Sequence, residues 1–223
     1  MAVTSTGLAY THPDERCGSM IRVGIFILVV TPIAPLVIWS QQMLSSASVS
    51  SSSVALRVAS AGLVRALGLG LINPISAECW PTGVVRALHA ARGLRRLLPA
   101  GGAAKAVRKS FESAYELRKS GQHSLDQYLR PFQDDAGSRT FDAHVAGLDG
   151  LELTRIEQEA STLLVRTVVV AGDSDPIVPL ASCRRLQSSL PSASLDVVVG
   201  GRHFLPEESP ERVASALRSV LVC

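Results

Sequence analysis

Two residues late in the chain have side chains and neighbours suited to proton transfer. Asp175 lies in Gly-Asp-Ser-Asp-Pro, directly after an apolar run, and His203 lies in Gly-Gly-Arg-His after the next apolar run. Histidine exchanges protons near neutral pH, and a carboxylate bonded to one ring nitrogen fixes the tautomer and stabilises the imidazolium. The pair therefore predicts acid–base chemistry, with Asp173 as a competing acid. The alternative is that Asp175 caps a turn and His203 is an ordinary surface-loop histidine.

Both candidates follow segments that predict parallel strands. Residues 167–171 and 195–199 are valine-rich runs of strand length, and residues 181–190 between them are compatible with a helix. Residues 67–72 predict an earlier strand, ended by Asn73-Pro74, and residues 210–222 predict a closing helix. Strands separated by helices pair in parallel, and chemistry in an open parallel sheet lies at the carboxyl ends of the strands. Asp175 and His203 are therefore expected at one sheet edge.

The long stretch between the strand at 67–72 and the strand at 167–171 is expected to be mainly helical. Segments with helical apolar spacing cover residues 81–98, 103–119, 124–132 and 140–148.

Three quarters of the chain carries motifs of one known family. Four segments carry these motifs: TVVVAGDSDPIVP, GRHFLPEESPE, the helix-like VALRVAS and LGLINPISAECWP. Through them, residues 54–221 resemble the α/β-hydrolase family. The resemblance implies a partial α/β-hydrolase-like parallel sheet with a helical lid insertion at about residues 76–148. It implies that Asp175 is the acid and His203 the general base. Residues 54–223 would form this domain.

The nucleophile is where the sequence departs from the family, which places a serine at the centre of G-x-S-x-G on a strand-to-helix elbow. This chain has no such motif, and the matched position is Val49. Ser48 and Ser50 flank that position, and Ser48 is the candidate nucleophile if Ser46-Ala47-Ser48-Val49-Ser50 is a degenerate elbow. A plain serine-rich turn is the alternative. Residues 1–47 also contain neither His-Gly nor Gly-Gly for an oxyanion loop, and they leave too little chain for the family's early strands, which are expected to be absent.

The first 53 residues are expected to form an atypical N-terminal segment. No charged residue lies between Arg22 and Arg57, and the apolar run at 23–39 contains two prolines. A buried parallel strand at 24–30 is the favoured interpretation, while a membrane anchor or signal peptide is the alternative. The favoured location is accordingly cytoplasmic, with membrane anchoring through residues 23–39 as the alternative. Eight of the fourteen residues from Ser40 to Ser53 are serine, which predicts either a linker or a strand-to-helix turn. A frame error in this segment is a further interpretation.

Composition excludes several function classes. A net charge of +3 and a basic stretch without interleaved aromatic residues do not indicate nucleic-acid binding. Four widely spaced cysteines predict neither a zinc site nor a disulfide framework. No dinucleotide, Walker or H-E-x-x-H motif occurs, so no cofactor or metal is expected.

These observations favour a serine hydrolase that acts on an ester or similar acyl bond of a small, largely apolar substrate. The alternative is a truncated, catalytically inactive hydrolase-like protein, membrane-tethered or not, that acts as a binding module. The sequence does not predict an oligomeric state.

Overall fold

One five-stranded sheet organises the part of the chain that the structure, a computed structural model, describes: residues 25–28, 36–41, 51–61, 66–80, 111–116, 121–146 and 150–220, with a few positions between 86 and 109. The strands lie in the order β1-β2-β3-β4-β5. Their bounds are β1 Ile25–Leu28, β2 Leu36–Gln41, β3 Ala66–Ile72, β4 Arg166–Gly172 and β5 Ala193–Val198. The strands β2 to β5 pair in parallel, and β1 pairs with β2 antiparallel at one edge.

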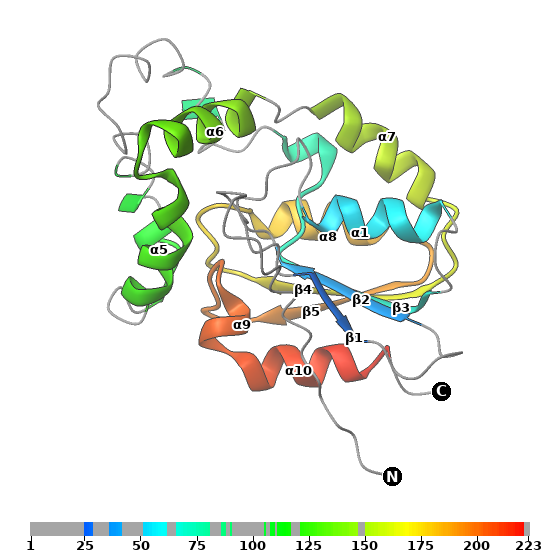
Figure 1. Cartoon of the computed structure of the whole chain (residues 1–223). Helices are drawn as coiled ribbons and strands as arrows, with labels where there is room; N and C mark the ends of the chain where they lie inside the picture. Colours follow the sequence, from blue (N-terminus) through cyan, green and yellow to red (C-terminus); the bar gives the residue numbers. More distant parts are fainter. Residues whose placement is uncertain are drawn as a thin grey trace.

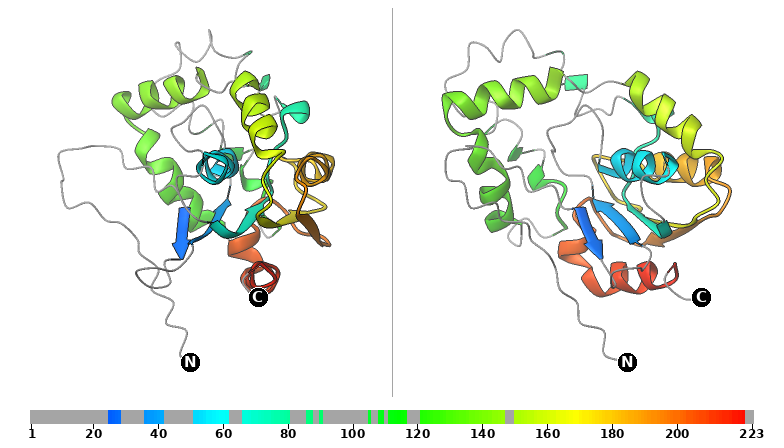
Figure 2. Two further views of the ribbon diagram at one scale, coloured as in Figure 1. Left: turned by 90° about the vertical axis from the view of Figure 1, so that its right-hand side faces the viewer. Right: turned by 45° about the vertical axis from the view of Figure 1, so that its right-hand side comes forward.

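Helices cover both faces of the sheet (Figure 1). On one face lie α1 Ser51–Ser60, α7 Gly150–Ala160 and α8 Leu180–Ser189, and on the other lies α10 Pro210–Arg218. The short α9, Leu205–Glu208, precedes α10, and the 3-10 helix η1, Ala77–Cys79, follows β3. The remaining described helices are α5 Gln122–Leu129, the 3-10 helix η2 Arg130–Phe132 and α6 Asp135–Ala146, which lie beside the sheet (Figure 2).

The core follows from the apolar runs of the central strands. Six consecutive residues of β4 are buried, as expected for a parallel strand covered on both faces. Their side chains alternate between two clusters, because successive residues of a strand point to opposite faces. Val169 and Ala171 pack with α1, α7 and α8, whereas Val168 and Val170 pack with α10. The partial α/β-hydrolase-like parallel sheet expected from the sequence is therefore present.

The described residues in and directly after the apolar run at 23–39 form two strands, β1 and β2. The favoured strand is present as β1, but its expected parallel pairing is wrong, because β1 runs antiparallel to β2. The second strand was not predicted, since only the segment before the prolines has a continuous β-branched run; Pro32 and Pro35 fall between the two strands. Within the described residues, no helix combines the length and apolarity needed to span a lipid bilayer.

The serine-rich tract connects a strand to a helix. The strand β2 ends at Gln41 and α1 begins at Ser51, three residues before the helix-like segment that the sequence suggested. The positions between them lie outside the described residues, as do most of the helices expected at 81–98 and 103–119. The domain boundary at 53/54 stays a prediction.

Burial makes Cys183 of α8 a sensitive reporter of this core. Its side chain is fully buried among α1, α7 and β4, and its Sγ lies 3.3 Å from the carbonyl oxygen of Pro74. Desolvation, reinforced by the charge of Asp175, raises the pKa of the thiol to about 12.

We expect the Cys183 thiol to react with a disulfide reagent at pH 8 about a thousandfold more slowly in the folded protein than in urea. The measurement uses a chain in which Cys17, Cys79 and Cys223 are replaced by serine, so that one thiol is counted. Equal labelling rates with and without urea would show that this core is not formed. A Cys183→Ser variant gives the background rate.

Candidate active site

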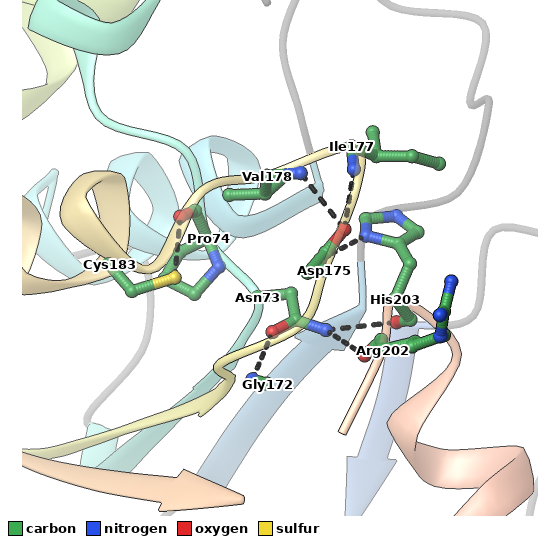
Figure 3. A network of polar contacts seen from close by, with 9 residues as sticks. All are labelled: Asn73, Pro74, Gly172, Asp175, Ile177, Val178, Cys183, Arg202 and His203. Atoms are coloured by element: carbon green, nitrogen blue, oxygen red, sulfur yellow. Dashed lines mark hydrogen bonds and ion pairs between the residues drawn. The ribbon is translucent and has the colours of Figure 1, made fainter. Parts of the chain in front are cut away.

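Three neighbouring strand ends bring the candidate residues together. Asn73 directly follows β3, Asp175 lies three residues after β4, and His203 lies in the loop after β5. Because these strands are parallel, their carboxyl ends share one edge of the sheet, and Figure 3 shows the three side chains converging there.

The side chains of Asp175 and His203 form a buried hydrogen-bonded pair. His203 Nδ1 lies 2.7 Å from Asp175 Oδ2, and the two side chains are 5% and 0% exposed. The second carboxylate oxygen, Oδ1, accepts hydrogen bonds from the backbone amides of Ile177 at 2.7 Å and Val178 at 3.0 Å. Because an ionised carboxylate can only accept hydrogen bonds, pairing with ionised Asp175 assigns the ring proton to Nδ1. The basic nitrogen is then Nε2, on the opposite side of the ring.

Asp173, the competing acid, has a different role in the structure. Its Oδ1 accepts hydrogen bonds from the Gly200 amide at 2.8 Å and from the Ser174 hydroxyl at 3.0 Å. It thereby ties the turn after β4 to the loop after β5 and does not contact the His203 ring through any described bond. The geometry pairs His203 with Asp175, the residue that the sequence favoured.

Close backbone approach sets the distance between these two loops. A Cβ atom on Gly172 would lie 2.2 Å from the carbonyl oxygen of Gly201, so only glycine lets the end of β4 contact the loop that carries His203. Gly200 has a φ of 74°, a left-handed conformation that glycine adopts without strain. Glycines in both loops thus permit the short Asp175–His203 distance.

The connection between β3 and β4 contacts the other side of the histidine loop. The His203 amide donates to the carbonyl oxygen of Ala114 at 3.1 Å, and Arg202 Nη1 donates to that of Ser113 at 2.6 Å. Phe204 stacks on Tyr115, with ring centroids 4.1 Å apart, and meets the His203 ring edge-on at 5.4 Å. Phe111 and Tyr128 of this connection also pack against Phe204, and the rings of Phe111, Tyr115, Tyr128 and Phe204 form an aromatic wall beside the histidine.

A carboxylate joins the two tyrosines of this wall. The hydroxyl groups of Tyr115 and Tyr128 donate to the two oxygens of Glu207, which lies on α9. Burial, followed by the interactions with Glu207, raises the pKa of both phenols above the ordinary tyrosine value. The connection is thus held to the segment that follows His203 by hydrogen bonds and ring stacking.

The candidate nucleophile Ser48 lies outside the described residues, and so does Ser50. The described start of α1 holds two buried serines, Ser52 and Ser53. Sequence reasoning treated Asn73 only as a strand terminator and did not identify its contacts with the histidine loop. Its position before proline at the end of an apolar run was the only available signal. Among the described residues, no group of three or more histidine, cysteine or acidic side chains could hold a metal ion.

An acid–histidine pair at the carboxyl edge of a parallel sheet, with helices on both faces and a helical connection beside it, is the arrangement of an α/β-fold hydrolase. Comparison with known proteins agrees: residues 44–216 match the model of the alpha/beta hydrolase family, and the chain belongs to that family.

Solved structures share this fold. An alpha/beta hydrolase fold protein of Burkholderia ambifaria superposes with a TM-score of 0.67 at 21% identity, covering 75% of this chain and 62% of that protein. The 2-hydroxy-6-oxo-6-phenylhexa-2,4-dienoate hydrolase of Rhodococcus sp. strain RHA1 gives a TM-score of 0.61 at 17% identity, covering 82% of this chain and 62% of that protein. A serine hydrolase of Cycloclasticus zankles gives 0.60 at 16% identity, with 82% and 62% covered.

A curated relative matches over a shorter region. The uncharacterized hydrolase YugF of Bacillus subtilis (strain 168) is 29% identical over 94 residues, which are 42% of this chain and 33% of that protein. The chain therefore spans about three fifths of the solved structures and a third of this relative.

The two tyrosines of the aromatic wall predict that the folded protein loses stability at alkaline pH. Because folding raises the pKa of Tyr115 and Tyr128, their stabilising contribution is complete below the unfolded value of about 10, and it declines as pH rises from there through the folded values. We expect the free energy of unfolding to fall more steeply above about pH 10 in the native chain than in a Tyr115→Phe/Tyr128→Phe variant. Urea titrations between pH 8 and pH 11 measure the difference. Parallel pH profiles for the two proteins would contradict the assignment.

Proposed function

We propose that this protein is a serine hydrolase that cleaves an ester or similar acyl bond of a small, largely apolar substrate. The observation that supports this most directly is the buried hydrogen bond between His203 Nδ1 and Asp175 Oδ2 at the carboxyl edge of the sheet. Family membership and the hydrolases among the structural relatives support the reaction class.

In the proposed mechanism, Ser48 is the nucleophile. Its oxygen attacks the acyl carbon while His203 Nε2 takes the hydroxyl proton, and Asp175 stabilises the resulting imidazolium. The tetrahedral intermediate expels the alcohol, which receives the proton from His203. Water then attacks the acyl-enzyme, giving its proton to His203, and the acid product leaves as the serine regains a proton.

The tract between β2 and α1 supports the choice of a serine here. It lies between the end of a parallel strand and the start of the next helix, which is where an α/β hydrolase carries its nucleophile. Residues 45–53 contain six serines in addition to Ser48, so the tract offers hydroxyl groups on both sides of Val49, the position that matches the family's nucleophile.

The aromatic wall supports an apolar substrate. Phe111 packs edge-on against Phe204 with centroids 6.3 Å apart, and Phe204 contacts the His203 ring. In this proposal the β3–β4 connection acts as the lid expected from the sequence and presents these rings to the acyl group. The partner is then a small molecule, without a cofactor.

A fluorophosphonate probe tests the proposal, because it forms a stable bond with an activated serine. We expect the native chain to be labelled in the serine tract, and Ser48→Ala to lose the label. Ser50→Ala is the matched control, since it removes the hydroxyl on the other side of Val49. Absence of label on the folded protein would contradict the proposal and support the alternative, a non-catalytic hydrolase-like binding protein.

The histidine has its own test. His203→Ala is expected to lower kcat for a p-nitrophenyl ester by about a thousandfold or more, since no other group would accept the serine proton. His123→Ala is the control, because His123 is exposed on α5 and bonds only Gln127 among the described contacts. Equal rates for the two variants would exclude His203 as the base.

A further inference from the structure

We propose that Asn73 is a positioning residue that sets the orientation of the His203 ring through the backbone of the histidine loop. Asn73 is fully buried. Its Nδ2 donates to the carbonyl oxygens of Arg202 and His203, each at 3.0 Å, and its Oδ1 accepts the amide proton of Gly172 at 2.9 Å (Figure 3). Only the expected effect of Asn73 on the rate of hydrolysis rests on the proposed function.

These bonds join both sides of the acid–histidine pair. Gly172 ends β4, three residues before Asp175, and the two carbonyls belong to the loop that carries the histidine. Asn73 therefore fixes the spacing between the two chain segments without contacting the carboxylate or the ring in any described bond. A carboxamide suits this place because it offers two donors and an acceptor at once.

The backbone of Asn73 also indicates a specific requirement. Its φ is 45°, in the left-handed region that asparagine tolerates better than most residues with a Cβ atom, and Pro74 follows directly. Its amide still donates to Val170 at 2.8 Å, continuing the pairing of β3 with β4. The unusual conformation turns the side chain toward the histidine loop at the point where the strand ends.

The main chain of His203 is then held from two sides. Its carbonyl accepts from the Asn73 side chain, at the end of β3, and its amide donates to the carbonyl oxygen of Ala114, in the β3–β4 connection. Because both backbone groups of His203 are bonded, the orientation of its ring depends only on the side-chain torsions, and the hydrogen bond to Asp175 restricts these. Loss of the Asn73 donors would leave a buried carbonyl at His203 without this partner and allow the loop to move.

Two substitutions separate the contributions of Asn73. Asn73→Asp keeps an acceptor for the Gly172 amide but cannot donate to the two carbonyls when ionised. Asn73→Gly accommodates the positive φ and removes the side chain. Ser182→Ala is the matched control, because the Ser182 hydroxyl is fully buried and accepts the Ser76 amide, away from the histidine loop.

The first readout is the pair of ¹⁵N chemical shifts of the His203 ring, which report the tautomer and need no substrate. We expect the native chain and Ser182→Ala to show the Nδ1–H form, and both Asn73 variants to show a mixture. A native ring without tautomer preference, or Asn73 variants with native ring shifts, would overturn the proposal. Should both variants fail to fold, solvent exchange of the Asn73 amide protons in the native chain decides, since rapid exchange contradicts the buried bonds.

The second readout is steady-state hydrolysis of a p-nitrophenyl ester. We expect both Asn73 variants to lose about tenfold to a hundredfold in kcat with KM within about twofold, and Ser182→Ala to keep both values. Native kcat in the Asn73 variants would overturn the positioning role while leaving the proposed function intact. A native chain without hydrolysis but with the expected ring shifts would contradict the proposed function and retain Asn73 as the residue that orients His203.

Discussion

The buried bond between Asp175 and His203 is the constraint to which the surrounding structure is adapted. A carboxylate with an exposed fraction of 0% is costly to ionise unless its oxygens are bonded, and here two backbone amides and an imidazole supply those bonds. The amides of Ile177 and Val178 are available because Pro176 and the turn after β4 direct the chain past the carboxylate. The turn therefore stabilises the charge and also directs Oδ2 toward the histidine.

Bringing two loops to this distance requires one close approach without a Cβ atom and two residues in the left-handed region. Gly172 contacts Gly201 so closely that a Cβ atom would overlap it, Gly200 is left-handed, and Asn73 is left-handed without being glycine. All three residues lie at or just after the carboxyl ends of β3, β4 and β5, next to the Asp175–His203 pair, and the two left-handed residues are departures of the kind that often mark functional sites. The regular strands β3 and β4 supply the rigidity against which these departures can be maintained.

The sequence predicted most reliably where an apolar run and its terminators agree. The valine run of β4, the following turn, α8 and β5 were predicted within two residues, because β-branched residues, proline and glycine all indicate the same boundaries. The helix α7 was missed, although Leu153, Ile156 and Ala160 are buried at helical spacing, because four charged residues among its eleven interrupt the apolar pattern. The strand β2 was missed because only the segment before Pro32 and Pro35 has a continuous β-branched run, and the pairing of β2 with β1 and β3 is a tertiary contact.

The site residues that belong to local sequence motifs were predicted, and those that act through long-range contacts were not. The acid and the histidine belong to local motifs, so residue type and neighbours were sufficient to propose them, and their pairing follows from parallel topology. Asn73 acts through contacts with residues about 100 to 130 positions away, and such distances leave no local pattern. The aromatic wall is similar: Tyr115, Tyr128 and Glu207 become neighbours only when the β3–β4 connection folds onto α9.

The bond from the His203 amide to the Ala114 carbonyl has a consequence for which changes this chain can accept near position 114. Every amino acid presents the same carbonyl, so the residue type at position 114 can change freely while the bond persists. What cannot change freely is the path of the chain, since an insertion or deletion nearby would move that oxygen. The β3–β4 connection of this chain must therefore bring its backbone to this place whatever side chain stands at position 114, and residue identities alone would not reveal the requirement.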